Sequence, residues 1–265
     1  MRLLSIVVLA AATASLAGDP VAELRTKLQG LKPSGTFSAR IEVKETGKQD
    51  DEGTAQETVE SVAVEASDGE AGLRISWTPA QLAQARREAL LRARNPDAPK
   101  SGGLATLDAE EAHGLLDAAE PLLQLLEGAT LVEARDDKFR GQPARLLVLT
   151  PRDAMSEKDR KRIKQHEDKL KLWLDAEGWP LGYERTVHIK ASFMLMSFTA
   201  DNNNSTQFGR TGDRLWVQSR ATSSSGAGMG QKGTTRRSVT VTALGAQAGA
   251  PGSTAAATAS PRAGS

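Results

Sequence analysis

Histidine, cysteine and serine most often carry nucleophilic or metal-assisted chemistry, and in this sequence they form no recognisable motif. The chain has three histidines, His113, His166 and His188, and no cysteine. None lies in an H-E-x-x-H pattern, no His, Asp and Glu set has metal-site spacing, and no G-x-S-x-G marks a serine nucleophile. We therefore predict a protein that is not an enzyme and has no cofactor. The alternative, a hydrolase with a dispersed site, requires His166 or His188 within hydrogen-bond reach of a serine and an aspartate.

One segment does match a nucleotide-binding motif, since Gly228–Gly233 reads G-x-G-x-x-G. A phosphate-binding loop of this type ends a strand and opens a helix, whose N-terminus faces the phosphate. The segment instead follows Ser223–Ser225 and leads into Ser238–Thr242, where residues alternate as in a strand. The pattern therefore favours a hairpin loop. Overlapping N-x-S/T sequences at Asn203–Thr206 are interpreted as turn residues.

The charges nearly cancel, with 34 Lys and Arg against 33 Asp and Glu in 265 residues and a formal net charge of +1. Binding to nucleic acid through counterion release needs a clear basic excess, so we predict no nucleic-acid partner. Between Arg152 and Lys171 basic residues outnumber acidic ones, but the signs are interspersed, which favours a solvated helix over 152–169. The candidate partner-docking residues in this segment are Arg160, Lys161, Arg162 and Lys164.

Residues 1–17 have the pattern of a secretory signal peptide. Arg2 precedes an apolar run over Leu3–Ala12, and Ser15-Leu16-Ala17 supplies the small residues of a cleavage site. The run is shorter than the roughly 20 residues of a membrane-spanning helix. We expect cleavage after Ala17 and a periplasmic or secreted protein that is peripheral to a membrane at most. It carries no lipid anchor, because Asp19 stands where the lipoprotein signal requires cysteine.

The C-terminal residues 245–265 consist almost entirely of Gly, Ala, Ser, Thr and Pro. Such a segment buries too little apolar surface to offset the entropy lost on ordering, so we predict a disordered tail. This leaves residues 18–244 as a single folded domain.

The first part of this domain changes from a helical to a strand pattern. Asp19-Pro20 is a typical helix start, and Gly30 a typical end. Apolar and polar residues then alternate from Phe37 to Lys44, which predicts a half-buried strand. A polar stretch follows, and residues 59–66 and 73–77 around the turn Ser67-Asp68-Gly69 predict a hairpin.

Residues 78–127 interrupt the strand pattern with a helical block. Thr78–Gln81 resembles a capping box, and a second helix is expected from about Asp108 to Gly128 with an interruption at Pro121. Its apolar stripe is interpreted as core that packs on a sheet; the stripe comprises Leu115, Leu116, Ala119, Leu122, Leu123 and Leu126.

Strand patterns then resume to the end of the domain. They cover residues 131–135, 144–150, 169–175, 183–199, 214–220 and 238–244. Strands and helices are segregated, and the strands follow one another through short turns. The sequence therefore predicts an α+β fold with a curved antiparallel sheet packed against helices.

The order of these elements resembles the periplasmic lipoprotein carriers of the LolA/LolB-like half-barrel superfamily. A short helix, Val21–Gln29, leads to the strand start Thr36–Arg40, as in those proteins. Further similar segments are Leu73–Pro79 and Gly141–Pro151, and the best is the strand-turn-strand of Leu172–Leu181. The resemblance implies an incomplete β-barrel with helices on its concave face. It also implies binding of acyl chains or a role as a periplasmic sensor or adaptor.

We therefore expect a noncatalytic periplasmic binding or carrier protein for an apolar ligand, either a lipid or a lipoprotein acyl chain. The alternative is a cell-envelope sensor or adaptor that binds a protein partner without a lipid ligand. The candidate residues that would line the apolar site are Phe37, Ile41, Ile75, Trp77, Leu172, Leu174, Ile189, Phe193 and Leu195. The competing interpretation is that these side chains simply pack on Leu115, Leu122 and Leu126.

Overall fold

The computed structural model describes residues 18–51, 54–95, 106–153, 155, 160, 162–193, 196–228 and 231–244. The predicted signal peptide, residues 1–17, and the predicted tail, residues 245–265, lie outside the described residues. Within them the structure contains four helices and one ten-stranded sheet. In chain order the elements are α1 (Pro20–Gln29), β1 (Phe37–Asp51), β2 (Thr54–Asp68), β3 (Arg74–Ser76), α2 (Pro79–Arg94), α3 (Ala109–Leu116), α4 (Ala119–Leu126), β4 (Thr130–Phe139), β5 (Gln142–Thr150), β6 (Ile163–Leu174), β7 (Pro180–Phe193), β8 (Met196–Thr211), β9 (Arg214–Gly228) and β10 (Gln231–Leu244).

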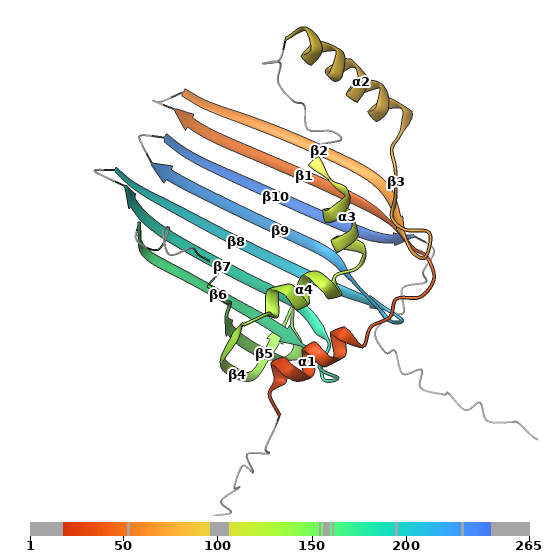
Figure 1. Cartoon of the computed structure of the whole chain (residues 1–265), viewed down its shortest axis with the longest axis vertical. Coiled ribbons are helices and arrows are strands. Elements are labelled where there is room, and N and C mark those ends of the chain that lie inside the picture. Colours follow the sequence, from red (N-terminus) through yellow and green to blue (C-terminus); the bar gives the residue numbers. More distant parts are fainter. Residues whose placement is uncertain are drawn as a thin grey trace, which may run out of the picture.

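All neighbouring strands of the sheet are antiparallel, in the order β3-β2-β1-β10-β9-β8-β7-β6-β5-β4 (Figure 1). The last strand, β10, lies between β1 and β9, and the sheet is not closed into a barrel because β3 and β4 form its two edges. The predicted α+β class with an antiparallel sheet and helices is confirmed. The Gly228–Gly233 segment connects β9 to β10, as expected for a hairpin.

Three of the helices, α1, α2 and α3, begin where the sequence predicts, because polar side chains cap their first N–H groups. Asp19 accepts a hydrogen bond from the backbone N–H of Val21 at 2.9 Å, and Pro20 follows as the first helical residue. Thr78 and Gln81 form a reciprocal capping box at the start of α2. Asp108 accepts from the N–H of Glu111 at 2.7 Å and caps α3.

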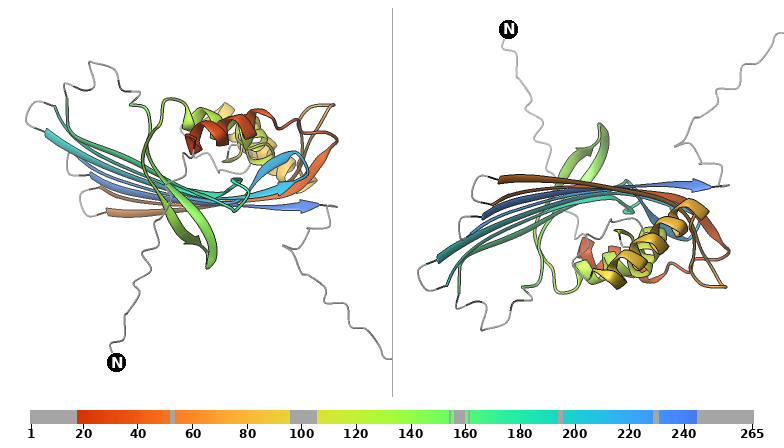
Figure 2. Two further views of the ribbon diagram at one scale, coloured as in Figure 1. Left: turned by 90° about the horizontal axis from the view of Figure 1, so that it is seen from below. Right: turned by 90° about the horizontal axis from the view of Figure 1, so that it is seen from above.

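Three of the helices, α1, α3 and α4, lie on one face of the sheet and cover only part of the length of its strands (Figures 1 and 2). We call this face the helix face; it carries Ile41, Val43, Val62 and Val239, which are all buried. The predicted apolar stripe is confirmed as core, since its members Leu115, Leu116, Leu122 and Leu126 are at most 2% exposed. We call the opposite side the bare face.

The bare face carries a second, smaller apolar cluster near the β4–β5 hairpin. It consists of Leu146, Val148 and Trp173, with Phe139 packed against Trp173 at 5.4 Å between ring centroids. The backbone N–H of Lys138 and the indole N–H of Trp173 together lower the pKa of the nearby Asp137 carboxyl. This cluster covers one corner of a face that is otherwise mostly polar.

Four local predictions are wrong. The predicted helix over 152–169 is strand β6 from Ile163 onward, and the predicted strand 183–199 is two strands, β7 and β8. Asn203–Thr206 lies within β8 rather than in a turn. The helical block breaks at Asp117–Ala118 instead of Pro121, which is the third residue of α4. Proline is tolerated there because the first N–H groups of a helix have no intrahelical partner.

A buried ion pair joins the end of β2 to the start of β9. Nη1 of Arg214 lies 2.8 Å from Oδ2 of Asp68, and the side chains are 6% and 10% exposed. Asp68 and Arg214 are far apart in the sequence, so the pair fixes the β8–β9 turn against the end of β2. Removing one member of a buried pair leaves an uncompensated charge in the protein interior.

We expect Arg214→Met to lower the free energy of unfolding by about 3–5 kcal/mol, because the buried Asp68 carboxylate then keeps only the longer contact of 3.5 Å with His113 Nδ1. Urea denaturation at neutral pH measures the effect. The matched control is Arg40→Met, whose ion pair with Glu42 is exposed at both ends (50% and 56%). The control should change stability by less than about 1 kcal/mol. Equal effects of the two substitutions would contradict a structural role for the buried pair.

Candidate functional site

The predicted apolar lining residues lie mostly in the core under the helices. Phe37, Ile41, Leu172 and Leu174 are buried, and Ile75 and Trp77 are partly buried against the same core. Ile189 is half-buried on β7. The side chain of Phe193 and all of Leu195 lie outside the described residues. The structure thus brings most of these residues together, and their role in lining a ligand site stays a prediction.

The predicted docking residues lie at the entry to β6. Arg160, Arg162 and Lys164 are exposed, and Arg160 pairs with Asp153 at 2.9 Å. Lys161 lies outside the described residues. The backbone of Arg162 is fixed, because its carbonyl oxygen accepts from the N–H of Ser192 at 2.9 Å.

A cavity of about 150 Å³ lies between α4 and the helix face of the sheet. Its lining residues are apolar or aromatic except for Arg220 and come from two sides: Ala118, Pro121, Leu122 and Leu125 at α4, and Tyr183, Phe208 and Arg220 on the sheet. The Tyr183 and Phe208 rings pack at 5.9 Å between centroids. The only charged group in this lining is the guanidinium of Arg220.

Two contacts hold α4 over this cavity. The N–H of Ala118 donates to the carbonyl oxygen of Leu215 in β9 at 2.8 Å. At the other end of α4, the guanidinium of Arg25 in α1 donates to the carbonyl oxygen of Leu126. The helix is therefore fixed at both ends, while its middle residues Leu122 and Leu125 face the cavity.

Strand register explains how Arg220 reaches this cavity. Tyr183, Thr206 and Arg220 pair in one row across β7, β8 and β9. Phe208 pairs with Val217 while Gln207 pairs with Ser219, so Gln218 is an extra residue in β9. This bulge reverses the alternation of β9 and places Arg220 on the same face as the fully buried Val217.

Other arginines on the helix face are paired with carboxylates. Arg237 makes a bidentate pair with Glu111 at 2.8 and 2.7 Å. Arg185 pairs with Asp168 at 3.0 and 2.6 Å, and this hydrogen bonding raises the pKa of Arg185. Nε of Arg220 is buried without a hydrogen-bond partner, as is Nε of Arg237. Arg220 differs because no carboxylate pairs with it within the described residues, whereas Arg237 pairs with Glu111.

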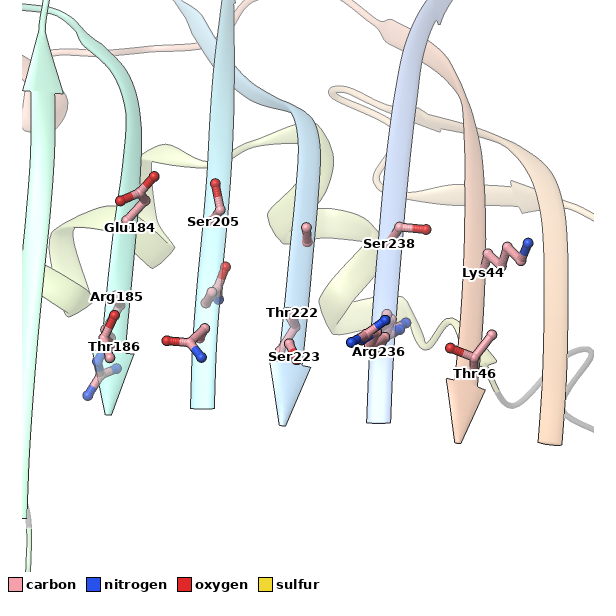
Figure 3. Close-up of a pocket in the computed structure, with 14 residues that line it drawn as sticks. Lys44, Thr46, Glu184, Arg185, Thr186, Ser205, Thr222, Ser223, Arg236 and Ser238 are labelled. Carbon is pink, nitrogen blue, oxygen red and sulfur yellow. The ribbon is translucent and has the colours of Figure 1, made fainter. Parts of the chain in front are cut away.

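A larger groove, of about 600 Å³, crosses the bare face (Figure 3). Figure 3 views the sheet with the helices behind it, and the labelled side chains come from β1, β7, β8, β9 and β10. Small residues such as Ser205 and Ser223 form the floor, between Lys44 and Arg236 on one side and Glu184 on the other. The groove offers hydroxyl and charged groups to a polar molecule, but it does not enclose an apolar one.

A histidine–aspartate pair lies near this groove but lacks the order of a hydrolase site. Nδ1 of His188 is 2.7 Å from Oδ1 of Asp201. The register then places Ser225 on the other side of Asp201. A nucleophilic serine needs the histidine between itself and the carboxylate, so this row has the wrong order for that chemistry.

No group of three or more His, Cys, Asp or Glu in the described part of the chain could hold a metal ion. None of the helices in the described ranges is long and apolar enough to cross a membrane. In comparisons with known proteins, neither a protein-family model nor a curated sequence matches the chain.

Sequence reasoning missed Arg220 because the predicted strand Arg214–Arg220 has strict alternation. Without a bulge, Leu215 and Val217 would face the core and Arg220 would face the solvent. The sequence contains no signal for the extra residue at Gln218. Thr206, which pairs with Arg220 and is only 1% exposed, is likewise predicted from the sequence to lie in a turn.

The Glu111–Arg237 pair anchors α3 to β10, next to the cavity region. We expect Glu111→Gln to lower the free energy of unfolding by about 1.5–3 kcal/mol and to speed hydrogen exchange in α3. The matched control is Glu110→Gln, which changes the same charge at the exposed neighbouring position. Denaturation and amide exchange measure both effects. If the two variants behave alike, the pair does not hold the helix.

Proposed function

We propose that this protein is a noncatalytic binding protein that holds an apolar chain between α4 and the sheet. The observation that supports this function is the cavity lined by Leu122, Leu125, Tyr183 and Phe208. Binding sites for small molecules are typically concave and mainly apolar, with few polar groups to fix orientation. The lining of this cavity has that composition.

The size of the cavity limits how much of a chain lies inside it. A protein cavity of about 150 Å³ accepts a benzene-sized molecule, so a long acyl chain must extend beyond it. On the same face, β7 continues from Tyr183 past the paired Arg185 to Val187 and Ile189, both half-buried. This strand therefore offers an apolar surface for the rest of the chain. Each methylene removed from water contributes about 0.8 kcal/mol.

The resemblance to the periplasmic lipoprotein carriers supports the same class of ligand. It also agrees with the predicted signal peptide, and we propose that the protein works in the periplasm or outside the cell. The candidate lining residue Ile189 lies on the proposed path, whereas Leu172 and Leu174 support the sheet beneath the helices.

The test uses monodecanoylglycerol, a soluble neutral molecule with one acyl chain. We expect saturable binding at one site by isothermal titration calorimetry, and at least about tenfold weaker binding to Leu125→Asp, because charge burial opposes binding. Leu123→Asp is the matched control: it lies on the same helix, is also partly buried, and does not line the cavity. Absence of binding to the wild-type protein, or equal loss in both variants, would refute the proposed site.

A second function, capture of an extended segment of a partner protein, is favoured by the edge of β6. β5 pairs only with Leu170–Leu174, so in the described residues no strand pairs with the outer side of Ile163–Lys169. The exposed cations Arg162 and Lys164 lie at the start of this edge. An open strand edge accepts an added strand through backbone hydrogen bonds, and nearby charges select the partner.

For this second function we expect the double variant Arg162→Glu/Lys164→Glu to lose a partner that the wild-type protein retains from a cell-envelope extract. Lys44→Glu, an exposed lysine on the interior strand β1, should retain it. Bound partner should also slow amide exchange in Ile163–Lys169. Retention by the double variant, or unchanged exchange in this segment, would exclude strand addition at β6.

A further inference from the structure

The cavity under α4 contains a cation that the fold does not neutralise. Nε of Arg220 is buried and has no hydrogen-bond partner. A charged group taken out of water is costly unless it is paired, and the guanidinium has five N–H donors to satisfy. Arg185, Arg214 and Arg237 each have a carboxylate partner within 2.8 Å. These three arginines are therefore paired, whereas within the described residues no carboxylate pairs with Arg220, which lines the cavity.

The position of Arg220 depends on a local departure from regular strand geometry. The bulge at Gln218 turns Arg220 from the bare face to the helix face. On the bare face the guanidinium would be solvated at no cost. The bulge instead brings it beside Tyr183, Phe208 and Leu125, where the side chain is partly buried and its Nε is shielded from solvent. Bulges that re-aim a side chain in this way are frequent next to binding sites.

We infer that the cavity binds the anionic head of an amphipathic molecule, with Arg220 as the group that recognises the anion. This inference rests on the proposed function and specifies its ligand: an apolar chain that ends in a carboxylate or a phosphate. A guanidinium binds either group through paired N–H donors. The head lies at Arg220 in the cavity, and the chain extends from the cavity along β7 toward Val187 and Ile189.

The lining residues account for selectivity as well as affinity. The other side chains of the cavity contribute apolar surface or, from Tyr183, one hydroxyl, so no carboxylate in this lining competes for the guanidinium. A neutral amphiphile gains only the burial of its chain. An anionic amphiphile gains the same burial and a charge-assisted hydrogen bond in a site of low dielectric.

The experiment compares decanoate, decyl phosphate and monodecanoylglycerol, which carry the same length of chain and differ in their heads. Isothermal titration calorimetry is performed on the full mature protein at neutral pH, below the micelle concentration of each compound. We expect at least one of the anions to bind about tenfold or more tightly than monodecanoylglycerol. Whichever anion binds more tightly identifies the carboxylate or the phosphate as the preferred head.

Arg220→Met removes the charge and keeps most of the side-chain volume. We expect it to abolish the preference for the anions over monodecanoylglycerol. Arg220→Lys should retain part of the preference, since it keeps the charge without the planar donor set. The matched control is Arg236→Met, on the bare face of the adjacent strand β10, which should behave as the wild type.

Thermal unfolding of the ligand-free proteins gives a second readout. Arg220→Met should melt at the wild-type temperature or above it, because the substitution breaks no ion pair. Equal binding of anionic and neutral compounds to the wild type would overturn the inference and leave the proposed function intact. A preference that persists in Arg220→Met would also overturn it. Failure of all three compounds to bind would overturn the proposed function itself.

Discussion

The structure depends on one constraint: the strands are longer than the layer of helices that covers them. Strands near the middle of the sheet are therefore apolar at one end and polar at the other on the same face. β1 shows the change, from Phe37, Ile41 and Val43 to Glu45 and Gln49. β10 shows it in reverse, from Gly233 and Thr235 to Val239 and Val241, because the two strands are antiparallel. Charged pairs such as Glu111–Arg237 lie at the border between the part of the sheet that the helices cover and the part that they leave uncovered.

This border also determines where a ligand finds both apolar contact and electrostatic recognition. Deep under the helices the core is filled, and Leu115, Leu116 and Leu126 show no measurable exposure. On the bare face the large groove is shallow and is lined by hydroxyl, amide and charged side chains as well as by their apolar parts. Only at the border do leucines of α4 meet the rings of Tyr183 and Phe208 beside a cation. The proposed binding site is thus a product of incomplete coverage, rather than of a hollow built into the core.

Much of the fold can be predicted from the sequence, and the predictions that are wrong have physical causes. The caps at Asp19, Thr78 and Asp108 predict their helices because capping is a local interaction. The sequence predicts a helix over 152–169 because the first half of β6 is polar on both faces, so no alternation marks it as a strand. The sequence does not predict the position of Arg220, because the face on which Arg220 lies depends on an extra residue in β9 that no local pattern signals. The pairing register of the strands, rather than local propensity, determines the face of the sheet on which Arg220 lies.

The place of β10 between β1 and β9 has a consequence for the order of folding. Ile41 near the start of the chain pairs with Val241 near the end of the described residues. The β1–β2 hairpin can form as soon as its residues emerge, but one side of β1 stays without its partner until β10 arrives. Contacts of such large sequence separation slow folding, and an open strand edge is prone to pair with other chains. The nascent chain consequently needs protection from aggregation until its last strand is available, and synthesis of the C-terminal segment is the event that completes the sheet.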